Sequence, residues 1–102
     1  MDYWKDCDVH VWDSFDAVRE SLPKSRFFYL TTKSSKLYWN ELFRDGDCFV
    51  FGRESRGLPQ SLLTDNPSAC LTIPMCPIAR SLNLSTSVGI VLFEGIRQLA
   101  MR

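Results

Sequence analysis

Apolar residues recur every three or four positions along the C-terminal part of the chain. This spacing predicts a helix from about residue 84 to the end, with one face suited to burial. The stretch 73–78 before it holds two prolines, which keep the backbone extended and exclude a helix. A polar cluster, 80–87, joins the two, so the pattern predicts a rigid polar loop leading into a buried helix. The apolar positions are Leu84, Val88, Val91, Leu92, Gly95 and Leu99.

Short runs of β-branched and aromatic residues, bounded by turn-forming residues, predict strands earlier in the chain. Three of them are buried strands at about 26–31, 47–52 and 69–73. A further short strand is expected around Val9–Trp12. The segment 38–43 fits a helical turn and an extended piece equally well, and the pattern leaves both open.

Two more helices separate these strands. The first begins at Asp13 or Ser14, either of which can cap it, and ends before Pro23. The second has Pro59 in its first turn and runs to about Leu63. This alternation predicts an α/β fold with a mainly parallel sheet and helices on both faces. The length of 102 residues suits one domain covering 1–102.

Composition and charge bear on whether the chain binds nucleic acid, metal or a membrane. Hydrophobic residues make up 45% of the chain, charged residues 24%, and the formal net charge is zero, so no overall basic field points to nucleic acid. Arginine prevails after residue 76, which indicates a weakly basic face. The four cysteines lack metal-ligand spacing, so we expect inert thiols and no metal. Without a signal peptide or a long apolar run, we expect a cytoplasmic protein and no membrane partner.

Polar or glycine-bearing loops follow the three main strands. These strands end at Leu30-Thr31, Phe51-Gly52 and Ile73-Pro74. Because ligands bind beyond the carboxyl ends of parallel strands, we expect the three ends to converge on one pocket. Cationic side chains in these loops favour phosphate contacts, with ordinary solvated loops as the alternative. The cations are Lys33, Lys36, Arg53, Arg56 and Arg80.

The segment 52–59, Gly-Arg-Glu-Ser-Arg-Gly-Leu-Pro, links the second main strand to the second helix. Its two glycines allow a sharp turn and the close approach of a ligand. The spacing G-x-E-x-x-G differs from the dinucleotide fingerprint and contains no Walker lysine. Taken alone, the pattern is typical of an ordinary strand-to-helix turn, with Glu54 as a carboxylate that braces the loop.

Three motifs together carry a specific resemblance that runs through nearly the whole chain. In order and spacing, the chain resembles the SPOUT superfamily of knotted RNA methyltransferases, and within it the tRNA (cytidine/uridine) 2′-O-methyltransferases that act on the wobble nucleotide. The resemblance implies a deep C-terminal trefoil knot, S-adenosylmethionine as cofactor, tRNA as substrate and a homodimer packed through the last helix. The motifs are Leu30-Thr-Thr-Lys33, Phe51-Gly-Arg-Glu-Ser-Arg-Gly-Leu-Pro59 and Ile73-Pro-Met…Arg80-Ser-Leu-Asn-Leu-Ser85.

The same resemblance implies roles for single residues. The residues that would contact the cofactor, mostly through backbone groups, are Leu30, Gly52, Ile73 and Ser81. Those that would line its adenine pocket are Met75 and Leu82. Supporting roles at the catalytic loops fall to Glu54 and Asn83. The cations that would face RNA are Lys33, Arg56 and Arg80.

The chain departs from the family pattern in three respects. Arg53 stands where proline or another small residue is more usual, and Phe93 where close relatives often carry tyrosine. Family members also have an N-terminal portion with the first strand and an Asn-Gly-Asn-type loop that carries an arginine. No residue here matches that arginine, the family's leading candidate for activating the poorly nucleophilic ribose hydroxyl.

We therefore expect this chain to resemble the C-terminal two-thirds of such an enzyme, and to methylate slowly or not at all by itself. Two alternatives stay open. One is a non-catalytic module that binds S-adenosylmethionine or RNA, or that dimerises. The other is a remnant that folds poorly, because loss of the first strands would expose a sheet edge and apolar surface.

Overall fold

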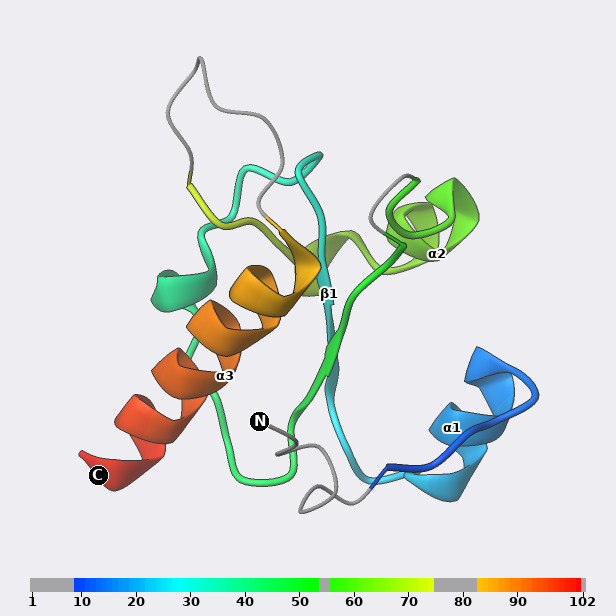
Figure 1. Ribbon diagram of the computed structural model, residues 1–102, viewed down its shortest axis with the longest axis horizontal. Coiled ribbons are helices and arrows are strands. Elements are labelled where there is room, and N and C mark those ends of the chain that lie inside the picture. The colour runs from blue at the N-terminus through cyan, green and yellow to red at the C-terminus, as the bar shows by residue number, and fades with distance from the viewer. Residues whose placement is uncertain (1–8, 54–55, 75–82, 102) are drawn as a thin grey trace.

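A three-stranded parallel sheet with helices on both faces forms the framework (Figure 1). In the computed structural model the strands are β1 (Phe27–Leu30), β2 (Cys48–Val50) and β3 (Cys70–Leu71), in the order β2-β1-β3. The predicted α/β fold and its parallel sheet are thereby confirmed. The residues that the structure describes are 9–53, 56–74 and 83–101.

The register of the strands brings their carboxyl ends together. Phe28 pairs with Phe49 across β1 and β2, and Leu30 pairs with Leu71 across β1 and β3, both in parallel. Beyond the strands, the Thr31 amide donates to the Leu71 carbonyl at 2.9 Å. All three strands therefore end at the same edge of the sheet, as the sequence predicted.

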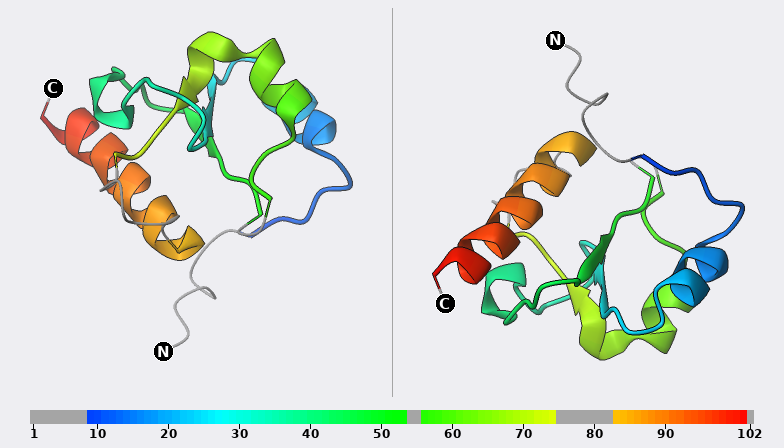
Figure 2. Two further views of the ribbon diagram at one scale, coloured as in Figure 1. Left: turned by 90° about the horizontal axis from the view of Figure 1, so that it is seen from above. Right: turned by 90° about the horizontal axis from the view of Figure 1, so that it is seen from below.

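One face of the sheet carries an apolar core that packs against α3 (Leu84–Ala100). Figure 2 shows this helix on one side of the sheet and the two shorter helices on the other. Alternation along β1 directs Phe28 and Leu30 to this face. The Phe43 ring lies edge-on to those of Phe28 and Phe49, with centroids 5.4 and 4.9 Å away. The core residues are Phe28, Leu30, Phe43, Leu71 and Val91.

The opposite face is covered by α1 (Phe15–Ser21) and α2 (Gln60–Asp65). Tyr29 and Cys70 point into this second cluster, together with Leu63 from α2. Burial raises the pKa of the Cys70 thiol, so this thiol stays protonated at neutral pH, as the prediction of inert cysteines requires.

Local capping signals explain where the helices begin. The Ser14 hydroxyl accepts from the Ala17 amide at 3.1 Å and caps α1, which ends two residues before Pro23. Pro59 immediately precedes α2 at the N-cap position. The helix predicted to start near residue 84 is confirmed as α3, and Asn83 caps it.

A tight turn connects β2 to the preceding segment. Gly46 has φ +89°, a left-handed conformation that glycine adopts without strain. The Arg26 guanidinium contacts the Asp47 carboxylate through two hydrogen bonds, of 2.9 and 2.7 Å. This contact raises the pKa of Arg26 and fixes the start of β1 to the start of β2.

Two expectations need correction or completion. The strand predicted at Val9–Trp12 is wrong: these residues are exposed, and no strand of the described chain pairs with them. A segment with an alternating pattern forms a strand only when its backbone groups bond to a neighbouring strand. The undecided segment 38–43 forms a 3-10 helix, η2 (Tyr38–Asn40), followed by extended chain. The knot expected from the resemblance involves residues 75–82, which lie outside the described residues, and it stays a prediction.

Candidate functional site

The three predicted strand ends lie side by side because the strands are parallel neighbours. Leu30 is buried in the core, and Ile73 is half-buried and packs against the same cluster. Gly52 follows β2 by two residues and is half-buried. At Leu30 and Ile73 the side chain therefore belongs to the core, which leaves backbone groups to face the loops.

The loop after β1 is fastened to the end of β3. The Ser34 hydroxyl donates to the Cys70 carbonyl at 2.8 Å. The Thr72 amide donates to the Lys36 carbonyl at 2.8 Å, and the Tyr38 amide donates to the Thr72 carbonyl at 3.0 Å. These contacts hold 31–38 beside β3, so the first and third loops share one rigid base.

Lys33 joins the first loop to the start of α2, directly after the second loop. Its ammonium group donates to the Gln60 side-chain carbonyl at 3.0 Å, and its amide donates to the Thr31 hydroxyl at 3.1 Å. Lys33 remains exposed above the start of α2. Lys36 differs, because its ammonium group forms an ion pair with Glu41 at 2.8 Å.

The second loop closes on itself at the end of β2. The Gly57 amide donates to the Arg53 carbonyl at 2.7 Å, and Gly57 has φ +68°. A Cβ on Gly52 would lie 2.1 Å from the Gly57 carbonyl carbon, so a side chain at position 52 would displace the backbone. Arg53 and Arg56 are exposed on this loop. Glu54 lies outside the described residues.

Asn83 takes the N-cap position of α3. Its side-chain carbonyl accepts from the Ser85 amide at 2.9 Å and from the Thr86 amide at 3.4 Å. This cap fixes where the preceding loop meets the helix, and the supporting role expected for Asn83 stays a prediction. The other predicted residues of that loop lie outside the described residues: Met75, Arg80, Ser81 and Leu82.

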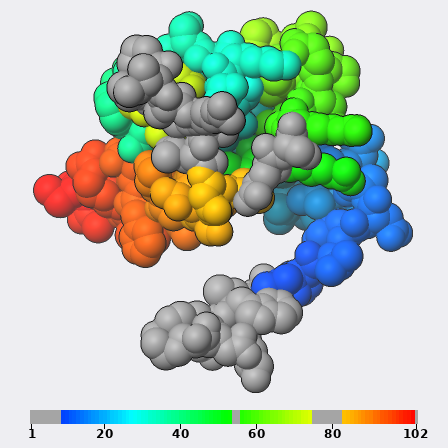
Figure 3. Space-filling model, turned by 45° about the horizontal axis from the view of Figure 1, so that its top comes forward, coloured from blue at the N-terminus to red at the C-terminus, as the bar shows by residue number. Residues whose placement is uncertain are grey.

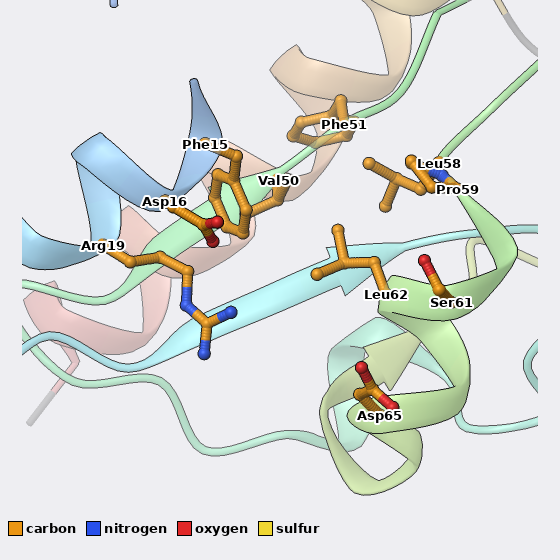
Figure 4. Close-up of a pocket in the computed structure, with 10 residues that line it drawn as sticks. All are labelled: Phe15, Asp16, Arg19, Val50, Phe51, Leu58, Pro59, Ser61, Leu62 and Asp65. Atoms are coloured by element: carbon orange, nitrogen blue, oxygen red, sulfur yellow. The ribbon is translucent and has the colours of Figure 1, made fainter. Parts of the chain in front are cut away.

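A cavity of about 480 Å³ lies between α1, β2 and α2 (Figure 4). It shares Phe51, Leu58 and Pro59 with the second loop, but neither Leu30 nor Ile73 reaches it. This cavity is therefore distinct from the pocket expected at the three strand ends. The full lining is Phe15, Asp16, Arg19, Val50, Phe51, Leu58, Pro59, Ser61, Leu62 and Asp65.

Among the described residues, no group of three or more histidine, cysteine or acidic side chains is arranged to hold a metal ion. None of the helices in the described ranges is long and apolar enough to cross a membrane.

Sequence reasoning missed two residues that position the loops. Neither Ser34 nor Gln60 was singled out from the sequence, yet Ser34 anchors the first loop to β3 and Gln60 accepts a hydrogen bond from Lys33. Their partners are distant in sequence, so no local pattern could have revealed them.

Comparisons with known proteins extend this picture. The model of a family described as "SpoU rRNA Methylase family" matches residues 1–93. A putative tRNA (cytidine(34)-2′-O)-methyltransferase of Geobacillus stearothermophilus is 38% identical over 101 residues, which are 96% of this chain and 64% of that protein. The tRNA (cytidine(34)-2′-O)-methyltransferase of Burkholderia cenocepacia is 42% identical over 102 residues, 96% of this chain and 65% of that protein. The chain thus spans about 64% of the length of such curated relatives.

A solved structure is also similar. One described as "Structural insights into the 2-OH methylation of C/U34 on tRNA" matches with a TM-score of 0.90 and 41% identity, covering all of this chain and 66% of the other.

Proposed function

This chain belongs to the SpoU rRNA methylase family, and from that premise we propose that it forms the cofactor- and RNA-facing part of a tRNA 2′-O-methyltransferase. The proposed reaction transfers a methyl group from S-adenosylmethionine to a ribose 2′-oxygen of the wobble nucleotide, in the cytoplasm. The observation that carries this proposal is the match of 96% of the chain to relatives named for that reaction. The joined loops at one sheet edge support it.

The described residues fit S-adenosylmethionine as the methyl donor. The chain turns so tightly after β2 that only glycine fits at position 52. Without a side chain there, the backbone groups of Gly52 are available to bind a ligand. The side chains of Leu30 and Ile73 lie in the core, so at these positions, as at Gly52, the backbone groups are the parts proposed to contact the cofactor. When bound, the cofactor supplies an activated methyl group, and Leu30, Gly52, Ile73, Ser81, Met75 and Leu82 are the residues proposed to hold it.

We assign the contact with tRNA to cations on the first two loops. Lys33 and Arg56 are exposed at the carboxyl edge of the sheet, on the first and second loops, and Lys33 also contacts Gln60 at the start of α2. Exposed lysine and arginine supply most phosphate contacts, and these contacts set the register of the RNA. Arg53 adds a third exposed cation to this rim, and Arg80 is proposed to complete it.

The chemistry of the ribose hydroxyl sets a limit on the activity. Its proton has to be removed or its oxygen stabilised by a positioned group. No residue of this sequence matches the arginine that is the family's leading candidate for activating the ribose hydroxyl. We therefore propose low activity for the 102-residue polypeptide alone, with Glu54 and Asn83 in supporting roles.

The proposed assembly is a homodimer packed through α3, in a single knotted domain. α3 buries Val91 and Gly95 against the sheet, yet it also exposes large apolar side chains on another face. A helix that is apolar on more than one side usually has a second neighbour. The exposed apolar residues of the helix are Val88, Leu92, Phe93, Ile96 and Leu99.

A methylation assay with radiolabelled S-adenosylmethionine and a tRNA transcript tests the proposal. We expect little label from the chain alone. We expect an increase of at least about tenfold when the unmatched remainder of the Geobacillus stearothermophilus relative is added as a separate polypeptide. A K33A/R56A variant should lose most of this increase, because it lacks two exposed cations at the rim. The exposed Lys24, between α1 and β1, provides the matched control, K24A.

The outcomes separate this proposal from the non-catalytic alternative. Label at nucleotide 34 in the mixture supports the enzyme. Absence of label from the mixture, with the relative's own full-length enzyme active on the same transcript, contradicts the proposed reaction.

A further inference from the structure

Gln60, the first residue of α2, contacts the ammonium group of Lys33 without neutralising its charge. Its side-chain carbonyl accepts from that ammonium group at 3.0 Å. No ion pair joins Lys33 to an acidic residue of the ranges that the structure describes. Because an amide carries no net charge and an ammonium group has further donors, Lys33 can still bind a phosphate oxygen. Figure 3 shows the first loop, in cyan, beside α2, in light green, on the surface.

The two partners of this contact are both held in place. The Gln60 amide donates to the Thr64 hydroxyl at 3.3 Å, which engages the donor end of the amide and leaves the acceptor end to face Lys33. The Lys33 backbone amide donates to the Thr31 hydroxyl at 3.1 Å, and the adjacent Ser34 is anchored on β3. Both the backbone and the ammonium group of Lys33 therefore have a defined position.

Lys36, on the same loop, shows the opposite arrangement. Its ammonium group pairs with the Glu41 carboxylate at 2.8 Å, so the two charges largely cancel. A phosphate that approaches Lys36 also meets the negative charge of Glu41. The partner of Lys33 is neutral, so of the two lysines Lys33 is the one suited to attract a phosphate.

We propose that Gln60 is a positioning residue for the contact with tRNA, because it holds Lys33 in place and leaves its charge uncancelled. This inference rests on the proposed function, in which Lys33 faces RNA, and it adds a residue outside the three motifs of the sequence. A lysine side chain loses rotational freedom when it binds, and one that is already held loses less. A glutamate at position 60 would also hold Lys33, but it would cancel the charge that binding needs.

Equilibrium binding of a tRNA transcript to the full chain, measured over a range of salt concentrations, tests the proposal without methyl transfer. The logarithm of the binding constant falls with the logarithm of the salt concentration, and the slope reports the number of phosphate contacts. We expect Q60E to weaken binding about tenfold and to reduce the slope by about 1, as K33A does. We expect Q60A to weaken binding about threefold at an unchanged slope, because Lys33 keeps its charge but is free to move.

Two controls separate this contact from a general effect of negative charge. Ser61 is exposed on the same helix and forms no hydrogen bond with Lys33, so S61E adds the same charge and should weaken binding far less than Q60E. In a chain that already carries K33A, Q60E and S61E should have equal effects, because no lysine is left to pair with position 60. Circular dichroism checks that each variant stays folded.

The outcomes distinguish this inference from the proposed function. Weaker binding by K33A, together with equal affinity and slope in Q60E and S61E, would overturn the inference and leave the tRNA contact standing. Q60E binding as tightly as the unaltered chain would also overturn it, since the contact would then only brace the loop. Unchanged binding by K33A would contradict both the tRNA contact of Lys33 and the role of Gln60.

Discussion

Gln98 and Glu94 show how single polar residues hold α3 in place. Gln98 is 8% exposed, and its carbonyl accepts from the Phe43 amide at 2.8 Å while its amide donates to the Glu41 carbonyl at 2.9 Å. The same amide donates to the Glu94 carboxylate at 2.8 Å. Arg97 donates twice to that carboxylate, at 2.9 Å each. These hydrogen bonds, first from Arg97 and then from Gln98, lower the pKa of Glu94.

This network predicts a dependence of stability on pH. Because the folded pKa of Glu94 lies below its ordinary value of 4.5, the carboxylate stabilises the fold above that value, and this contribution is lost as the pH falls through the lowered pKa. The midpoint of thermal unfolding should therefore drop between about pH 5 and pH 3, and less so in E94Q. The exposed Glu20 offers the control variant E20Q. An identical drop in E94Q and the unaltered chain would contradict this role of Glu94.

At the scale of elements, α3 depends on its cap. Asn83 accepts hydrogen bonds from two amides in the first turn that would otherwise lack an intrahelical partner. We expect N83A to lower the free energy of unfolding by about 1 kcal/mol, and N83D to retain most of the stability. Chemical denaturation measures both, with S85A at an exposed neighbouring position as the control. Equal stability of N83A and the unaltered chain would show that the cap contributes nothing.

Local signals explain why most elements could be predicted. The Ser14 cap, Pro23, Pro59 and the turn at Gly46 act within a few residues of themselves, so the sequence alone locates α1, α2 and the start of β2. The strand predicted at Val9–Trp12 does not form, because a strand needs a partner strand, and a local sequence pattern does not show whether one is present. The η2 segment stayed undecided because its position depends on Thr72 and Gln98, which are distant in sequence.

At the candidate site, too, local features could be predicted from the sequence and contacts between distant residues could not. Sequence reasoning found the three strand ends, because parallel strands place them at one edge. It also singled out Lys33, but not its contact with Gln60, nor the anchoring of Ser34 on β3. The sequence linked Gly52 to a sharp turn and to the close approach of a ligand. The described contacts account for the turn, because a Cβ at position 52 would collide with the Gly57 backbone, and the ligand contact stays a prediction.

At the scale of the whole molecule, the proposed dimer makes α3 an interface. Ile96 and Leu92 are 48% and 45% exposed, one turn apart on the face that points away from the sheet. A double variant, L92E/I96E, would place two charges in the interface, and we expect it to be monomeric where the unaltered chain is dimeric. Sedimentation velocity measures this, with T86E at an exposed position near the start of the helix as the control. A chain that is already monomeric at high micromolar concentration would contradict the dimer.

We propose above all that the carboxyl edge of this sheet binds S-adenosylmethionine, and calorimetric titration tests this most directly. We predict saturable binding to the unaltered chain and a loss of affinity of at least about tenfold, or about 1.4 kcal/mol, in G52A. The loss is expected because the added Cβ would force apart the backbone at Gly52 and Gly57. Gly89 in α3 has open space around its Cα, so G89A should bind like the unaltered chain. No heat from the folded, unaltered chain at millimolar S-adenosylmethionine would contradict the claim.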